Sequence, residues 1–271
     1  MEIMAVIAAA AVIGITGLLI GLLLGIAGKK FAVEVDEREA EVREVLPGNN
    51  CGGCGYAGCD ALAQAIAKGE APTNACPVAG AEIAKKIAEI MGETAEETTR
   101  QVAFVKCNGT CDKANIKYNY YGVQDCQKAS MVPGGGEKAC SYGCMGFGSC
   151  VKVCPFDAIH IVDGIAKVDK EKCKACKKCI AVCPRNLIEL VPYTSTVKVA
   201  CSSTDRGPVV KKVCDTGCVG CNICEKNCNF DAIHVEDNLA KIDYEKCKNC
   251  GLCAMKCPSK IILKENKVSS R

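Results

Sequence analysis

The sequence predicts an α+β protein made of a single N-terminal transmembrane helix, a small helical domain and two tandem copies of a larger unit. Three observations support this order. An uncharged apolar run occupies Ile3–Ala27, and a glycine- and cysteine-rich stretch follows at Pro47–Asp60. The C-terminal half then repeats itself at an offset of 74 residues, so that Cys154 corresponds to Cys228. Such self-similarity indicates duplication of a whole structural unit.

The apolar run is long enough to cross a membrane. As a helix it would span ~37 Å, more than the ~30 Å of a hydrocarbon core. A cleaved signal peptide is the alternative, but it would begin with basic residues, and this chain begins with Met1 and Glu2. Lys29 and Lys30 follow the run. We therefore expect a single-pass cell-membrane protein with the bulk of the chain in the cytoplasm.

Cysteine dominates the composition, with 25 of 271 residues. Cytoplasmic thiols stay reduced, so these cysteines are expected to bind metal rather than to form disulfides. The chain has 2 histidines, no tryptophan and a net charge of +3. This composition excludes histidine-rich metal sites, and it gives no sign of a nucleic-acid partner.

The spacing of cysteines in each copy is typical of a ferredoxin with two [4Fe-4S] clusters. Three cysteines at C-x2-C-x2-C bind one cube, and a fourth, before proline, ligates the other. Zinc ribbons with four thiolates would explain neither the Cys-Pro endings nor the crossed spacing. In the second copy the expected sets are Cys218, Cys221, Cys224 and Cys257, and Cys228, Cys247, Cys250 and Cys253.

The first copy departs from this pattern at one position. One set is standard and consists of Cys154, Cys173, Cys176 and Cys179. In the other set, Phe147 stands where the second copy has Cys221, and phenylalanine cannot ligate iron. Cys140 is the natural replacement, so the expected set is Cys140, Cys144, Cys150 and Cys183.

A further cysteine set lies before the repeats. Its candidate ligands are Cys51, Cys54, Cys59 and Cys76. Neighbouring glycines allow the backbone to wrap closely around a cluster. Cys59–Lys68 and Val78–Met91 have apolar residues at helical spacing, which predicts a small helical 4Fe-4S domain. From spacing alone, a zinc site remains an alternative.

The order of these motifs resembles a known family. A glycine-flanked membrane helix, the sequence NCGGCGYAGC at 50–59 and the ferredoxin repeats resemble the B subunit of Rnf complexes, in the long form with two ferredoxin pairs. Rnf complexes are membrane-bound, ion-translocating ferredoxin:NAD oxidoreductases. The resemblance implies [4Fe-4S] clusters, electrons arriving from reduced ferredoxin, and other membrane and peripheral subunits as partners.

Five cysteines stay outside these five sets. Four of them could hold a sixth cluster, and the alternative is that they are buried thiols or remnants of the duplication. They are Cys107, Cys111, Cys126, Cys201 and Cys214. We therefore expect five [4Fe-4S] clusters and leave a sixth open.

Lysines crowd one cysteine loop of the first copy. Basic patches speed encounter with acidic partners such as ferredoxins. The alternative is a solvated face that also offsets cluster charge. The candidate docking residues are Lys172, Lys174, Lys177 and Lys178.

The expected function is electron transfer within a translocase complex. The chain has no Gly-rich dinucleotide fingerprint, flavin motif or nucleophile–base pair, so it carries no complete active site. Alternatives are a carrier subunit of another membrane oxidoreductase, or a structural or regulatory iron–sulfur protein. The expected domains are a membrane helix at 1–30, a 4Fe-4S domain at 31–92, a linker with extra cysteines at 93–139, and ferredoxin-like units at 140–192 and 193–271, the last with a tail.

Overall fold

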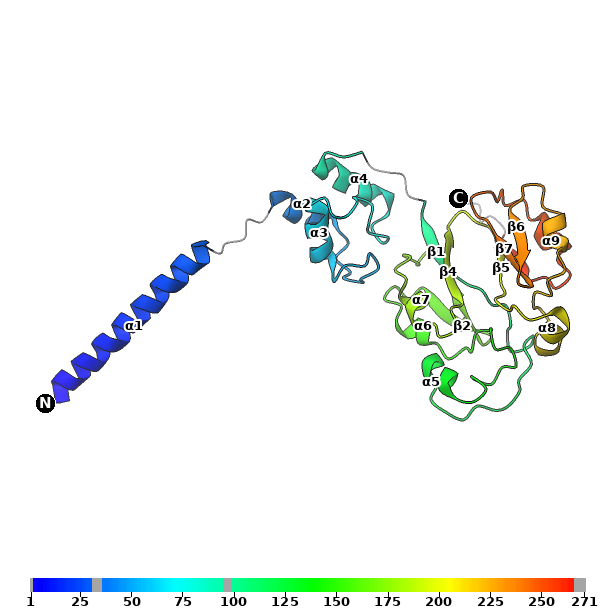
Figure 1. Ribbon diagram of the computed structural model, residues 1–271, viewed down its shortest axis with the longest axis horizontal. Coiled ribbons are helices and arrows are strands. Elements are labelled where there is room, and N and C mark those ends of the chain that lie inside the picture. The colour runs from blue at the N-terminus through cyan, green and yellow to red at the C-terminus, as the bar shows by residue number, and fades with distance from the viewer. Residues whose placement is uncertain (1, 31–35, 95–98, 266–271) are drawn as a thin grey trace.

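A long helix, a small helical domain and a larger α+β body follow one another along the chain (Figure 1). The computed structural model describes residues 2–30, 36–94 and 99–265. Strands and helices alternate only in the larger body, which holds both copies of the repeat. The mixed α+β character expected from the sequence is confirmed.

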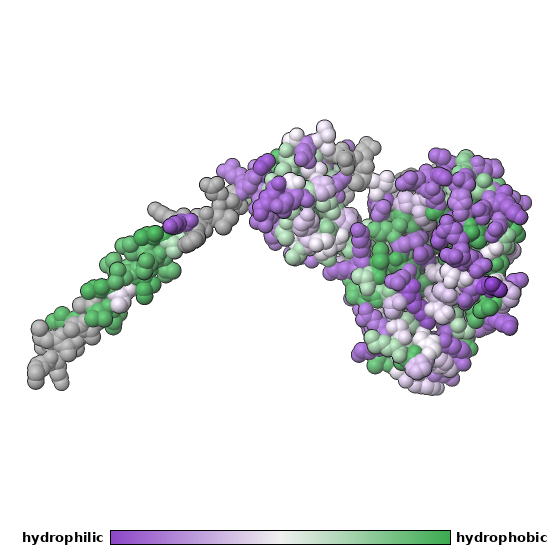
Figure 2. All heavy atoms as spheres, viewed as in Figure 1, coloured by the Kyte–Doolittle hydropathy of each residue, from purple (hydrophilic) through white to green (hydrophobic). Residues whose placement is uncertain are grey.

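The first helix, α1 (Glu2–Lys30), is apolar along the part shown in green in Figure 2. Its described large apolar side chains, from Ile7 to Ile26, are each at least 56% exposed. Within the described residues, no helix is both long and apolar enough to cross a membrane. The expected span of 3–27 falls partly on residues 3–6 and 8–11, whose side chains lie outside the described set. Membrane insertion therefore stays a prediction.

The helical domain contains α2 (Glu37–Val45), α3 (Cys59–Ala67) and α4 (Gly80–Met91), which confirms the two helices expected from periodicity. The Asp36 carboxylate caps α2 by accepting the backbone N–H of Arg38 at 3.0 Å. Gly92 ends α4 in the left-handed conformation, with φ of 71°. The apolar faces of the helices meet in a core whose fully buried members include Val42, Leu62, Ala63, Ile66 and Ile87.

The first ferredoxin-like unit is closed by a pairing between distant strands. β1 (Gln101–Val105) pairs antiparallel with β4 (Ile188–Pro192). Between them, β2 (Ile159–Val162) and β3 (Ile165–Val168) form a hairpin. Its turn, Asp163-Gly164, has positive φ at both residues, which suits the right-handed twist of the strands.

The segment 93–139 is more than the expected linker. It supplies β1, whose Val102 and Val105 are buried in the core of the first unit. It also supplies α5 (Cys126–Met131), which Asp125 caps by accepting the backbone N–H groups of two residues, at 3.0 and 3.1 Å. β1 reads Gln-Val-Ala-Phe-Val, and this short apolar run pairs with β4 to complete a two-stranded sheet.

Single-turn helices lie at the cysteine loops of both units. In the first unit these are α6 (Ser149–Lys152) and α7 (Lys178–Val182), and in the second α9 (Ile223–Lys226) and α10 (Leu252–Lys256). Each begins after a residue in the left-handed conformation: Gly148, Lys177, Asn222 and Gly251. This bend turns the chain back around the space that the cysteines face.

The second unit repeats the arrangement. β5 (Val197–Val199) pairs with β8 (Ile262–Lys264), and β6 (Ile233–Glu236) forms a hairpin with β7 (Leu239–Ile242). A further helix, α8 (Gly207–Val213), precedes the cysteine run. Phe104 of β1 packs against the cores of both units, so the two copies form one body.

Candidate metal centres

Three of the expected cysteine sets come together around hollows of the ferredoxin-like units. Each hollow is lined by four cysteines and has a volume of about 320–350 Å³, open mouth included. The loop and its single-turn helix bring three cysteines together, and the fourth arrives from the other half of the unit. The sets are Cys154, Cys173, Cys176 and Cys179; Cys218, Cys221, Cys224 and Cys257; and Cys228, Cys247, Cys250 and Cys253.

A fourth hollow differs from the expected grouping. Its cysteines are Cys126, Cys144, Cys150 and Cys183, whereas the sequence pattern favoured Cys140 in the place of Cys126. The reason is the cap of α5. The backbone N–H of Cys126 donates to Ser149 Oγ at 2.8 Å, and that hydroxyl donates to the Asp125 carboxylate at 2.9 Å. These bonds fix Cys126 beside Cys150, the neighbour of Ser149.

Phe147 shows why this unit needs a different fourth cysteine. It occupies the position of Cys221 in the other copy, and its ring lies 5.2 Å, between centroids, from the ring of Tyr120. Both rings pack against a small cluster that contains Cys126, Ala129 and Met145. An aromatic contact therefore stands where the other copy has Cys221, and α5 brings Cys126 to the hollow from another direction.

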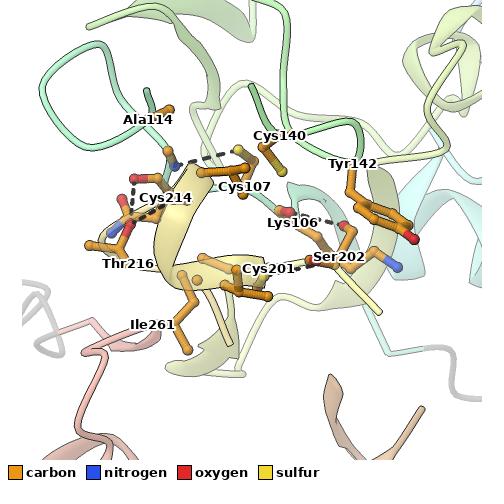
Figure 3. Close-up of a pocket in the computed structure, with 18 of the residues that line it drawn as sticks. Lys106, Cys107, Ala114, Cys140, Tyr142, Cys201, Ser202, Cys214, Thr216 and Ile261 are labelled. Atoms are coloured by element: carbon orange, nitrogen blue, oxygen red, sulfur yellow. Dashed lines mark hydrogen bonds between the residues drawn. The ribbon is translucent and has the colours of Figure 1, made fainter. Parts of the chain in front are cut away.

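A fifth hollow, of about 450 Å³, lies between the two units (Figure 3). Its cysteines are Cys107, Cys140, Cys201 and Cys214. Sequence reasoning left three of them unassigned. A signal was present, because V-K-C-N-G-T at 105–110 resembles V-A-C-S-S-T at 199–204, but these copies do not share the 74-residue offset. Cys111 is exposed and lies outside all five hollows.

Backbone N–H groups point at several of these sulfur atoms. Cys154 and Cys228 occupy equivalent positions, and each accepts a bond from the backbone N–H four residues later, at 3.5 and 3.4 Å. Cys144 and Cys173 accept similar bonds from Ala166 and Ala103, both at 3.4 Å. Such donors stabilise the negative charge of thiolates. Among the described residues, no group of three or more histidine, cysteine or acidic side chains is placed to hold a single metal ion.

Burial disfavours the ionised, thiolate form of these cysteines. It raises the pKa of Cys150 and of Cys179 to about 12, and neighbouring cysteines add to the rise. It raises the pKa of Cys224 and of Cys253 to about 11. Iron ligands must be thiolates, so the positive charge of the bound iron has to stabilise the ionised form of these cysteines. The donor sets fit [4Fe-4S] clusters, whose irons take four cysteine thiolates.

The N-terminal set lies at the edge of the helical domain. Cys59 begins α3 and is buried, while Cys54 and Cys76 pack against the same core. Asn50 Oδ1 accepts the backbone N–H of Cys59 at 2.8 Å, which holds the glycine-rich loop on the helix. Burial raises the pKa of the Cys76 thiol, and Cys54 and Cys51 raise it further. Cys51 and Cys54 therefore lie near Cys76, and Cys54, Cys59 and Cys76 share one core.

The loop of this set touches the first ferredoxin-like unit. A Cβ atom placed on Gly53 would lie 2.9 Å from the carbonyl oxygen of Cys176 and 3.0 Å from its Cα. Only glycine allows two backbones to approach this closely. The N-terminal set and the set containing Cys176 are thus neighbours across this contact.

The lysine-rich loop surrounds the same contact. All four candidate docking lysines are exposed. Lys172 forms an ion pair with Asp157 at 3.1 Å, which lowers the pKa of that carboxyl. No such pair is described for Lys174, Lys177 and Lys178 within the described part of the chain.

Together the fold and the donor sets define an iron–sulfur protein of the ferredoxin type. Three family matches agree with this class. An Fe-S cluster family matches residues 46–78, an LdpA Fe-S cluster-binding domain matches 140–194, and a 4Fe-4S dicluster domain matches 217–261.

Relatives along most of the chain define the family. The chain is 49% identical to the B subunit of the Na⁺-translocating ferredoxin:NAD⁺ oxidoreductase complex of Acetobacterium woodii, over 95% of this chain and 78% of the relative. It is 43% identical to the B subunit of the ion-translocating oxidoreductase complex of Methanosarcina acetivorans, over 93% and 96%. The B subunit of the proton-translocating ferredoxin:NAD⁺ oxidoreductase complex of Clostridium ljungdahlii is 42% identical, over 92% and 88%. The chain belongs to this family, the B subunits of ion-translocating oxidoreductase (Rnf) complexes.

Proposed function

We propose that the chain is the electron-transfer subunit of a membrane-bound, ion-translocating ferredoxin:NAD oxidoreductase. It takes electrons from reduced ferredoxin and relays them through [4Fe-4S] clusters to membrane partner subunits. The observation that carries this proposal is the lining of the ferredoxin-unit hollows, each by four cysteines from both halves of a unit. The names of the relatives support the choice of complex.

Five ligand sets belong to this proposal. Four are the sets of the ferredoxin-like units, with Cys126 as the fourth ligand beside Cys144, Cys150 and Cys183. The fifth is the N-terminal set of Cys51, Cys54, Cys59 and Cys76. When bound, the clusters supply one-electron redox chemistry. The protein contributes the thiolates, the backbone N–H donors to sulfur, and the burial that excludes water.

The contact at Gly53 supports a path for electrons between the N-terminal set and the ferredoxin-like units. It joins the N-terminal set, which lies nearest α1 in sequence, to the first ferredoxin-like unit. The cysteines that are exposed within ferredoxin sets, Cys221 and Cys250, belong to the second unit. We infer that ferredoxin reduces the repeated units and that the N-terminal set passes electrons toward the membrane subunits.

Membrane attachment by α1 is part of the proposal. The helix presents its described apolar side chains to the surroundings rather than to the rest of the protein. Large exposed apolar surfaces mark membrane or protein contacts. We propose a single pass through the cell membrane, with the bulk of the chain in the cytoplasm.

Metal analysis tests the proposal directly. The anaerobically purified chain should hold at least about 20 irons, from about four per cubane, and almost no zinc. Reduced ferredoxin should bleach the clusters and generate paramagnetic signals. A Cys51→Ala chain should still accept these electrons but fail to pass them to membrane subunits. Stoichiometric zinc, or iron near about eight per chain, would contradict the proposal.

A further inference from the structure

Three of the four cysteines that line the hollow between the two units lie outside the three family matches, and the fourth, Cys140, is the first residue of one of them. Its cysteines come from both copies of the repeat. Cys107 follows β1 by two residues, and Cys201 follows β5 by two residues. Cys140 and Cys214 are separated by the 74-residue repeat offset. Each unit therefore contributes an equivalent pair of thiols to one shared space.

The equivalent sulfurs also have equivalent hydrogen bonds. Cys107 Sγ accepts the backbone N–H groups of Gly109 at 3.4 Å and Cys144 at 3.3 Å. Cys201 Sγ accepts those of Ser203 at 3.5 Å and Cys218 at 3.4 Å. Both cysteines are partly buried, and sulfurs that accept two N–H donors each favour the negatively charged thiolate.

The four sulfurs lie close to one another across the hollow. A Cβ atom on Gly143 would lie 3.4 Å from Cys140 Sγ and 3.6 Å from Cys107 Sγ. One on Gly109 would lie 3.6 Å from the sulfurs of both Cys107 and Cys214. Figure 3 shows Cys201 at the opposite wall, beside Ile261. The arrangement encloses a space rather than pairing the thiols.

The walls of the hollow are joined across the two units. Ser202 Oγ donates to the Lys106 carbonyl at 3.0 Å, and Thr216 Oγ1 donates to the Asn108 carbonyl at 3.3 Å. The backbone N–H of Asn115 donates to the Val213 carbonyl at 3.0 Å. These bonds join the two units at residues next to the cysteines of the hollow.

A buried cation provides an independent indication of an anionic ligand. Lys138 lines the hollow and is 3% exposed. Its ammonium donates to the carbonyls of Gly109 at 2.9 Å and Gly164 at 2.7 Å. Within the described residues, no carboxylate pairs with it. A buried ammonium without a counter-charge is strongly unfavourable, and four thiolates around a cluster would supply that charge.

We propose that Cys107, Cys140, Cys201 and Cys214 bind a [4Fe-4S] cluster shared by the two ferredoxin-like units, with Lys138 as its buried counter-charge. This inference rests on the proposed function for its role. The shared cluster connects the two units as carriers of electrons. Together with the five sets of the proposed function, it assigns 24 of the 25 cysteines as ligands. Cys111 is the one cysteine left without a ligand role.

Iron counts in single and double variants test the set. Cys201→Ala should lower the iron content by about four per chain, whereas Cys111→Ala, the matched control, should leave it unchanged. Adding Cys140→Ala to Cys201→Ala should cause no further loss, because both remove the same site. Adding Cys126→Ala should remove about four more irons. Additive losses for Cys140 and Cys201, or no loss with Cys201→Ala, would overturn the set.

Two further measurements keep the test decisive. If Cys201→Ala is insoluble, Cys214→Ala takes its place in the single and double variants. A wild-type iron content near about 20 per chain, rather than about 24, overturns the shared site. The proposed function stands in that case.

Lys138→Gln keeps a hydrogen-bond donor but removes the positive charge. It should shift one reduction equilibrium at least tenfold, which is about 59 mV for one electron. Lys138→Arg should restore it, and exposed Lys152→Gln should not shift it. An unshifted potential in Lys138→Gln refutes the counter-charge.

Discussion

Gly53→Ala should uncouple the N-terminal cluster from the ferredoxin-like units without removing any cluster. The new Cβ would meet three backbone atoms of Cys176 at 2.9, 3.0 and 3.3 Å. Ordinary carbon contacts begin near about 3.5 Å, and a backbone cannot swing aside as a side chain can. Overpacking of this kind costs about 1–3 kcal/mol. At a factor of ten per about 1.4 kcal/mol, the docked arrangement becomes about 5–150-fold less favoured.

The assay follows electrons across the contact. Reduced ferredoxin is mixed with the chain, and freeze-quenched paramagnetic resonance reports when the N-terminal cluster is reduced. The signal of that cluster is identified by its absence in Cys51→Ala. Gly53→Ala should delay this signal, while the signals of the other clusters appear at the wild-type rate.

Gly55→Ala is the control for local strain. Gly55 lies in the same loop with φ of 90°, and a Cβ there meets nothing within 4 Å. It therefore adds backbone strain without touching the first unit. A wild-type rate in Gly53→Ala, or an equal delay in Gly55→Ala with full iron content in both, would refute the role of the contact.

Three more outcomes are expected. Exchanging Lys172, Lys174, Lys177 and Lys178 for Glu should slow reduction by ferredoxin, most at low salt; if only transfer to the N-terminal cluster slows, these lysines serve the domain contact instead. Removing Met1–Lys30 should release a soluble, brown chain with its full iron, because the clusters fold the rest; loss of iron on truncation would place α1 within a cluster domain. Ile87→Ala, at a fully buried position of α4, should lower the free energy of unfolding of the helical domain by about 2–5 kcal/mol. Denaturant unfolding of the anaerobic protein measures this loss, and an unchanged midpoint would contradict it.

Local spacing was enough to group the cysteines that line three of the hollows. C-x2-C-x2-C fixes three sulfurs within one loop, so their grouping needs little knowledge of the rest of the chain. The fourth ligand of the first unit depended on longer-range structure. Cys140 is the better candidate by sequence offset, but the cap formed by Asp125 and Ser149 brings Cys126 to the hollow instead.

The cysteine set of the hollow between the units could not be predicted from the sequence for a similar reason. Cys107 and Cys201 are 94 residues apart, because the insertion around α5 lengthens the first unit. A search at the 74-residue offset therefore missed their equivalence. The pairing of β1 with β4 also joins residues that are 83 to 91 positions apart, so a segment with no strong pattern of its own was expected as a linker.

The closing strand pairs have a consequence for how such a chain can grow. Gln101 faces Pro192 at one end of the first ladder, and Val197 faces Lys264 in the second. The polypeptide thus enters and leaves each unit at neighbouring points, as in domains that tolerate insertion into a host chain. A unit of this kind can be duplicated in tandem without changing the fold of the segments before or after it. Each added copy adds redox sites and leaves the existing ones unchanged.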